Sequence, residues 1–177
     1  MSWLKKGVLL AFVWSLILCF NTSVKGQSVL QKDDFEPPTP SNWTTNSTDI
    51  INGKACVNGG DNLWIINNAY NGNLTIPVYN TEPQPAGITA SPNSTYLHIV
   101  NSVLNANGVS NANYYWPNPT NEQYMTKMSS SISTVGYTDV TFSFWWLNWA
   151  NEDTSGQVFY SIDNGVTWVR TPNVYAG

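Results

Sequence analysis

Aromatic rings beside an amide are the residues of this sequence whose types and spacing best suit a chemical task. Trp145 and Trp149 fall on one face of an expected strand, with Asn148 next to them. Flat rings of this kind stack on the faces of sugars, and a neighbouring amide bonds the hydroxyls. A second platform, in an expected loop, consists of Tyr114, Tyr115 and Trp116. The sequence therefore predicts sugar binding at these residues, unless a second sheet or a loop covers the rings.

Side chains for catalysis are scarce. His98 is the one histidine of the sequence, and Cys56 is the one cysteine left if the N-terminal segment is removed on export. A cysteine nucleophile needs a base close to it, and nothing in the sequence links these two residues. We therefore expect Cys56 to be a small, half-buried apolar side chain, with an intermolecular disulfide as the alternative. We expect His98 to be a sheet residue without a catalytic role.

Motifs of known hydrolases are missing from the sequence as well. One histidine cannot form the H-E-x-x-H site of a metalloprotease, and Arg170 alone cannot form the arginine cluster with which a sialidase holds its substrate. Glu82, Glu122 and Glu152 could supply the two carboxylates of a glycosidase, but none of them lies in a recognisable motif. The sequence thus predicts a protein that is not an enzyme within these residues.

The N-terminal segment predicts export. Two lysines precede residues 7–20, an uncharged apolar run shorter than the roughly 20 residues of a comfortable membrane span. We expect a signal peptide over residues 1–26, cleaved before Gln27, and a secreted or cell-surface protein with no membrane span after cleavage. Lipid attachment at Cys19 is disfavoured because Leu18 is larger than the residue expected before a lipidated cysteine. An uncleaved membrane anchor is the third alternative.

The charge of the expected mature chain limits its partners. It keeps four basic side chains against eleven carboxylates, a formal net charge of −7. Binding to nucleic acid is carried by lysine and arginine, so we expect no nucleic-acid partner. The acidic surface suits a solvated extracellular protein and leaves carboxylates free for calcium.

The longest alternating pattern of the chain lies in residues 139–149. Phe142, Phe144 and Trp146 share one face at period two, and we expect all three to be core residues. A second alternating run, over residues 157–162, leads into the turn signal Asp163-Asn164-Gly165. The pattern predicts strands on both sides of a tight turn.

Shorter segments complete an all-β pattern. Strands are expected over residues 29–36, 63–66, 74–79, 95–100 and 124–132, whereas residues 42–48, 52–61 and 101–121 have the composition of loops. Since no segment carries a helical stripe, we expect an all-β, antiparallel β-sandwich of jelly-roll type, as one domain over residues 27–177. The chain stops in a loop after a strand, so we expect this domain to be incomplete and the chain to be a fragment.

Residues 161–168 fit the pattern S-x-D-x-G-x-T-W, which resembles the Asp-box turn. The aspartate is expected to accept hydrogen bonds from backbone N–H groups, the glycine to supply a positive φ, and the tryptophan to pack beneath the hairpin. The motif is specific for a turn but not for a function, because it occurs in sialidase propellers and singly in jelly-roll modules. Its positions here are Ser161, Asp163, Gly165, Thr167 and Trp168.

Several segments, taken in order, resemble the secreted jelly-roll domains called choice-of-anchor J or cleaved-adhesin domains, with MAM and reelin-type jelly rolls as more distant relatives. They are residues 34–36 followed by Trp43-Thr44, residues 96–99, residues 136–144 and residues 156–168. The likeness covers most of residues 33–171 and depends on their order and spacing. Such domains are common in secreted multidomain proteins of Bacteroidetes.

The resemblance implies a calcium site and a function. Asp34 and Glu36 match the position where related jelly rolls bind a structural calcium ion, and an acidic strand end exposed to water is the alternative. Together with the export signal, the all-β pattern, the single Asp box and the lack of a catalytic set, the resemblance predicts a non-catalytic, adhesin-like or carbohydrate-binding module of a larger secreted protein. The expected partner is a cell-surface or extracellular glycan or protein. The alternative is an accessory domain of a secreted hydrolase or protease whose active site lies beyond residue 177.

Overall fold

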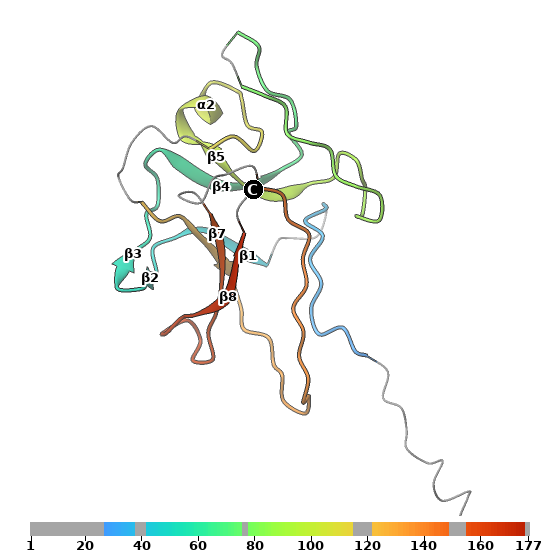
Figure 1. Cartoon of the computed structure of the whole chain (residues 1–177), viewed down its shortest axis with the longest axis vertical. Coiled ribbons are helices and arrows are strands. Elements are labelled where there is room, and N and C mark those ends of the chain that lie inside the picture. The colour runs from blue at the N-terminus through green and yellow to red at the C-terminus, as the bar shows by residue number, and fades with distance from the viewer. Residues whose placement is uncertain (1–26, 38–41, 76–77, 115–121, 149–154, 176–177) are drawn as a thin grey trace, which may run out of the picture. The chain divides into compact units, whose positions relative to one another are not determined.

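The computed structural model describes residues 27–37, 42–75, 78–114, 122–148 and 155–175 (Figure 1). Within these ranges the chain forms eight strands and one short helix, α2 (Ser102–Ala106). Every strand pair is antiparallel, so the prediction of an all-β protein is confirmed at this level. No helix in these ranges is long and apolar enough to cross a membrane.

The strands form four separate two-stranded pairs. These are β1 (Trp43–Ser47) with β6 (Met125–Met128), β2 (Ile50–Ile51) with β3 (Lys54–Ala55), β4 (Asn62–Asn67) with β5 (Tyr96–Asn101), and β7 (Gly156–Tyr160) with β8 (Val169–Tyr175). The β4–β5 pair has the longest unbroken register, from Asn62 opposite Asn101 to Asn67 opposite Tyr96. Its apolar and aromatic side chains suit a half-buried pleated surface.

Some strands lie where the sequence pattern predicted loops, and some segments that were predicted to be strands are irregular. Residues 42–48 were expected to be a loop but contain β1, and residues 52–61 begin within the β2–β3 hairpin. The sequence does carry a signal for that hairpin, the pair Asn52-Gly53, which is typical of a two-residue turn between strands. In the structure both residues have the positive φ that such a turn requires, +52° and +75°. The expected strand over residues 29–36 is irregular, and residues 73 and 78 form only an isolated bridge.

Asn46 joins two of the strand pairs through its side chain. It has φ +54° and interrupts the β1–β6 register, so its amide leaves the ladder and faces β4. Its Nδ2 donates to the Trp64 carbonyl at 3.0 Å, and its Oδ1 accepts from the Trp64 N–H at 2.7 Å. The amide thus supplies the two hydrogen bonds that a neighbouring strand would otherwise make, and it connects the β1–β6 pair to the β4–β5 pair.

A small apolar cluster connects the other pairs. Ile51, Cys56 and Met125 are buried together, and Phe159 and Trp168 pack against them. Cys56 forms no disulfide within the described residues and is 4% exposed, so its side chain is more deeply buried than the half-buried one expected. The cluster places β7 and the turn after it against the β2–β3 hairpin and β6.

His98 lies in β5, as expected, within a stack of rings. Its imidazole stacks on Tyr96 with ring centroids 4.3 Å apart, and Tyr96 in turn packs on Tyr70 at 4.8 Å. His98 Nε2 lies 3.0 Å from Asn67 Oδ1, and that oxygen also accepts from the Ala69 N–H. Burial lowers the pKa of His98 to about 4, so the ring is neutral at pH 7.

The expected core position of Phe142, Phe144 and Trp146 is wrong. Their side chains are 61%, 41% and 49% exposed, and residues 139–148 join no strand ladder within the described part of the chain. Alternation places the three rings on one face, but burial also requires a second layer over that face. Here the rings contact one another and the end of β8 instead.

We expect Asn46→Ala to lower the free energy of unfolding by about 2–4 kcal/mol. The change removes two hydrogen bonds, leaves the Trp64 backbone unpaired and puts alanine at a positive φ. Asn52→Ala is the matched control, because Asn52 has nearly the same φ but an exposed side chain. If both variants lose the same free energy of unfolding in urea, the Asn46 amide does not stabilise the link between the β1–β6 and β4–β5 pairs.

We expect stability to fall in acid partly through His98. Between pH 6.5 and about 4 the unfolded chain binds a proton that the folded ring rejects, which costs up to about 3 kcal/mol of unfolding free energy. This contribution is absent above pH 6.5 and complete below about pH 4. His98→Phe should flatten the profile in this range, as measured by urea unfolding at steps of half a pH unit. An unchanged profile would contradict the low pKa.

Candidate functional site

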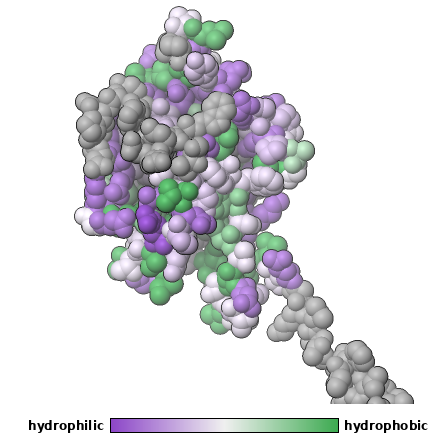
Figure 2. Space-filling view, in the orientation of Figure 1, coloured by the Kyte–Doolittle hydropathy of each residue, from purple (hydrophilic) through white to green (hydrophobic). Residues whose placement is uncertain are grey.

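Residues 140–147, called the aromatic segment below, carry a run of exposed large apolar side chains among the described residues. In Figure 1 residues 129–148, drawn in orange, leave the sheet region and return, reversing direction through a turn in which the Tyr137 N–H donates to the Thr134 carbonyl at 3.1 Å. Along the returning leg, Trp145 is 71% exposed and Leu147 is 58% exposed. Hydrophobic residues gather at the lower end of the face shown in Figure 2.

Tyr175, at the end of β8, fixes the aromatic segment in place. The rings of Phe144 and Trp146 meet the edge of Tyr175, with centroids 5.3 and 5.0 Å apart. Asn148 Nδ2 donates to the Tyr175 carbonyl at 2.6 Å. The structure therefore gives Asn148 a structural task, whereas Trp145 is 71% exposed and makes no described ring contact.

The remaining predicted sugar-binding residues are only partly described. Tyr114 is half-buried, and Tyr115, Trp116 and Trp149 lie outside the described residues. Of the first group, Trp145 is exposed and Asn148 is bonded to the Tyr175 carbonyl, and no described contact joins the two side chains. A joint role with Trp149 or with the ring platform at residues 114–116 stays a prediction.

Asp34 and Glu36, the predicted calcium ligands, lie on an irregular segment rather than a strand. Phe35 between them has φ +61°, so the two carboxylates do not share a strand face. Glu36 Oε1 accepts from the Thr95 N–H at 2.7 Å, while Asp34 Oδ1 accepts from the Glu36 N–H at 3.3 Å. In the described ranges no three His, Cys, Asp or Glu side chains gather in a way that could hold a metal. Calcium binding here stays a prediction.

The Asp box forms the turn between β7 and β8. Asp163 Oδ1 accepts from the Thr167 N–H at 2.8 Å, and Asp163 Oδ2 accepts from the Thr167 hydroxyl at 2.6 Å. Ser161 Oγ donates to Asp163 Oδ1 and accepts from the Gly165 N–H at 2.7 Å. Asn164 and Gly165 both have positive φ, +57° and +84°. These contacts match the turn expected from the motif.

The Asp box is stabilised by hydrogen bonds to the Asp163 carboxylate and by packing of Trp168. Hydrogen bonds from Thr167 and Ser161 lower the pKa of Asp163 to about 2, so its carboxylate accepts these bonds across the ordinary pH range. On the inner side, Trp168 packs on the apolar cluster. Near it, Asp49 accepts from Lys127 Nζ at 2.7 Å, and this contact lowers the pKa of Asp49. The Trp168 indole N–H makes no hydrogen bond to the described residues, and of the groups that shift the pKa of Asp49 it contributes least.

The described residues bring no catalytic set together. His98 is buried in the ring stack, and Cys56 is buried in the apolar cluster, where loss of solvation raises the pKa of its thiol. Arg170 is exposed on β8. Of the glutamates, Glu122 accepts a hydrogen bond from Tyr124, and Glu82 lies in a different loop.

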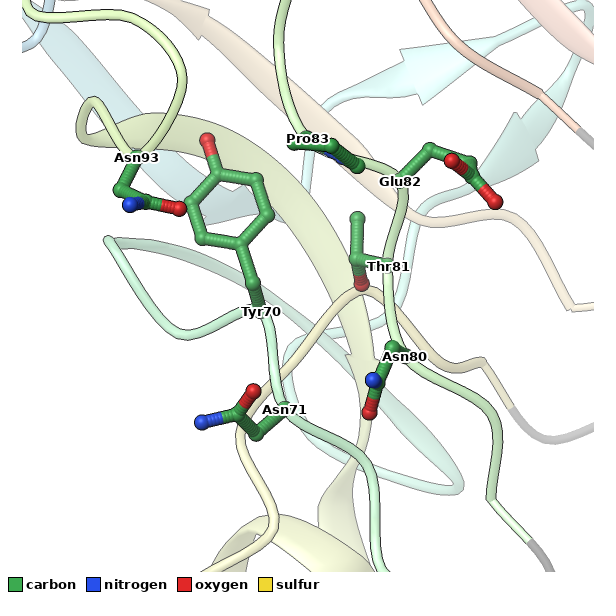
Figure 3. Close-up of a pocket in the computed structure, with 7 residues that line it drawn as sticks. All are labelled: Tyr70, Asn71, Asn80, Thr81, Glu82, Pro83 and Asn93. Atoms are coloured by element: carbon green, nitrogen blue, oxygen red, sulfur yellow. The ribbon is translucent and has the colours of Figure 1, made fainter.

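A feature that the sequence analysis missed is a polar hollow of about 310 Å³, called the Tyr70 hollow below. It lies in the connection between β4 and β5 (Figure 3). No alternation or motif marks it, because its walls come from separate loop stretches whose asparagines and prolines indicate only turns. Its lining consists of Tyr70, Asn71, Asn80, Thr81, Glu82, Pro83 and Asn93.

Comparison with models of protein families, with curated proteins and with solved structures finds no match to this chain. The resemblance to choice-of-anchor J and cleaved-adhesin domains therefore rests on the residues and spacing of the sequence.

We expect Gly165→Ala to lower the free energy of unfolding by about 1–2 kcal/mol. A β-carbon there would be 3.5 Å from Trp168 Cζ2, an ordinary contact, so the cost comes from the positive φ. Gly156→Ala is the matched control, because its φ is not positive and its β-carbon would also make only ordinary contacts, with Tyr175. Equal midpoints for both variants in urea unfolding would mean that the turn does not constrain the fold.

Proposed function

We propose that this protein is a non-catalytic extracellular module that binds glycans on a cell surface or in the extracellular matrix. The observation that carries the proposal is the aromatic segment, where Phe142, Phe144, Trp145 and Trp146 expose between 41% and 71% of their side chains. Single exposed rings are common on proteins, but a contiguous group of them marks an interaction surface. The lack of a catalytic set among the described residues agrees with a role in binding.

Trp145 is the residue that meets the glycan. Its ring is the most exposed of the group, and its neighbours Phe144 and Trp146 are held by Tyr175. A ring held on a fixed segment loses little conformational entropy when it binds. The negative face of an indole favours the weakly positive C–H face of a sugar ring, in the same way that it favours the edge of another ring. A protein surface is the alternative partner of such a patch.

The proposal also includes secretion or display at the cell surface and a jelly-roll fold. The signal-like N-terminal run and the acidic composition support secretion or display at the cell surface. The antiparallel pairs and the Asp-box turn support a jelly-roll arrangement, with a calcium ion near Asp34 and Glu36 as an element of that family. Titration of the protein with Ca²⁺, compared with Asp34→Asn, tests the calcium part separately.

We expect Trp145→Ala to weaken glycan binding about three- to tenfold, which corresponds to the roughly 0.5–1.5 kcal/mol of an aromatic contact. Wild-type protein is first screened on a glycan array and on cells, and the best ligand is then titrated by calorimetry. Tyr160→Ala is the control, because Tyr160 on β7 is 51% exposed but lies outside the aromatic segment.

Two outcomes would overturn the proposal. One is that the wild-type protein binds neither the glycan array nor cells but measurably hydrolyses a polysaccharide or a peptide. The other is equal glycan affinity of Trp145→Ala and wild type, which would remove the aromatic segment from the binding surface.

A further inference from the structure

The Tyr70 hollow contains an aromatic ring that is fixed before any ligand arrives. The Tyr70 hydroxyl donates to the Ser94 carbonyl at 2.8 Å, and its ring packs on Tyr96. Ser94 is 1% exposed, and its own hydroxyl donates to Gln84. The ring can therefore offer its free surface to a ligand without losing further rotational freedom.

Three asparagine side chains line the same hollow. Asn71, Asn80 and Asn93 are exposed and line the hollow, and Figure 3 shows Asn93 on one side of Tyr70 and the other two below it. Asn80 Oδ1 accepts from the Gly72 N–H at 2.8 Å, which leaves its Nδ2 for a ligand. In the described part of the chain the side chains of Asn71 and Asn93 make no hydrogen bond with the protein. An amide supplies both a donor and an acceptor, which suits adjacent hydroxyl groups.

Hydrogen bonds hold the stretch of the wall that carries Asn80. The Thr81 N–H donates to the Tyr70 carbonyl at 2.8 Å, and Thr81 Oγ1 accepts from the Ala112 N–H at 3.0 Å. Asn111, which is fully buried, donates to the Tyr79 carbonyl at 2.8 Å. A β-carbon at Gly72 would collide with the backbone oxygens of residues 78 and 79, so the two sides of this loop lie as close as the chain allows.

The charge of the lining selects a neutral ligand. None of the seven described residues around the hollow is basic, so an anionic sugar would find no cation there. Glu82 is the one acidic residue of the lining, and in Figure 3 its carboxylate points away from the Tyr70 ring. The volume of about 310 Å³ is at the small end of the range for small-molecule sites.

We infer that the Tyr70 hollow is a second binding site, which takes one neutral hexose unit of a glycan. The ring stacks on the C–H face of the sugar, and Asn71, Asn80 and Asn93 bond its hydroxyls. This inference rests on the proposed glycan-binding function and adds to it a second site and a ligand class. Together with the aromatic segment, the site gives the protein two places at which one branched glycan, or two glycans, are held.

The test is an NMR titration of the ¹⁵N-labelled full mature chain with glucose, galactose and mannose, and with N-acetylneuraminic acid as the anionic counterpart. We expect at least one neutral hexose to shift the amide signals of Tyr70, Asn71 and Asn93, with a dissociation constant in the millimolar range, and the anionic sugar to shift none of them. The double variant Asn71→Ala, Asn93→Ala should weaken this binding about tenfold or more, because both amides are free of internal bonds. Asn173→Ala, which removes an exposed amide on β8, is the matched control.

The outcomes separate this site from the aromatic segment. Hexose shifts that survive the double variant, or that cluster at Trp145 alone, would overturn the Tyr70 hollow as a site and leave the proposed function standing. Shifts at Tyr70 with N-acetylneuraminic acid would overturn the ligand class. Glycan binding that is weakened in Trp145→Ala, with hexose shifts at Tyr70 retained in that variant, would support two separate sites. No binding to arrays or to any hexose would overturn both proposals.

Discussion

The described strand pairs are joined through side chains, and the pair of hydrogen bonds between the Asn46 amide and the backbone of Trp64 is one of these links. Each strand pair is short, and a two-stranded pair is only marginally stable alone in water. One side chain at a positive φ replaces a stretch of ladder and connects the β1–β6 pair to the β4–β5 pair. The β4–β5 pair in turn carries the ring stack of Tyr96 and His98, against which the Tyr70 hollow is built.

The second connection runs through Trp168 and carries the aromatic segment. The Asp box holds this ring against the apolar cluster, and β8 begins directly after it. At the far end of β8, Tyr175 packs on Phe144 and Trp146 and accepts a hydrogen bond from Asn148. The exposed rings are therefore held by a strand that is itself fixed at its start. This continuity explains how a segment outside every described ladder still presents its side chains in one arrangement.

Local signals in the sequence predicted local structure well. The Asp box, β4, β5 and β7 were all expected from motif or alternation, because each depends on residues close together in the chain. The expectation failed where the outcome depends on a distant partner. β1 was taken for a loop because of its polar composition, whereas its ladder partner is the distant strand β6. Phe144 was expected in the core because alternation cannot tell whether another layer will cover a face. The Tyr70 hollow was missed for the same reason, since separate loop stretches form its walls.

The central claim is that the aromatic segment is uncovered in the free protein and is covered by a glycan. Hydrogen–deuterium exchange of residues 140–147 tests this claim most directly, because amides outside a ladder exchange fast until a ligand protects them. We expect exchange within seconds in the free protein, and clear slowing after addition of the best array ligand, with little change in β4 and β5. Strong protection of these amides in the free protein would show that the segment is already paired in a sheet, and the account would be wrong.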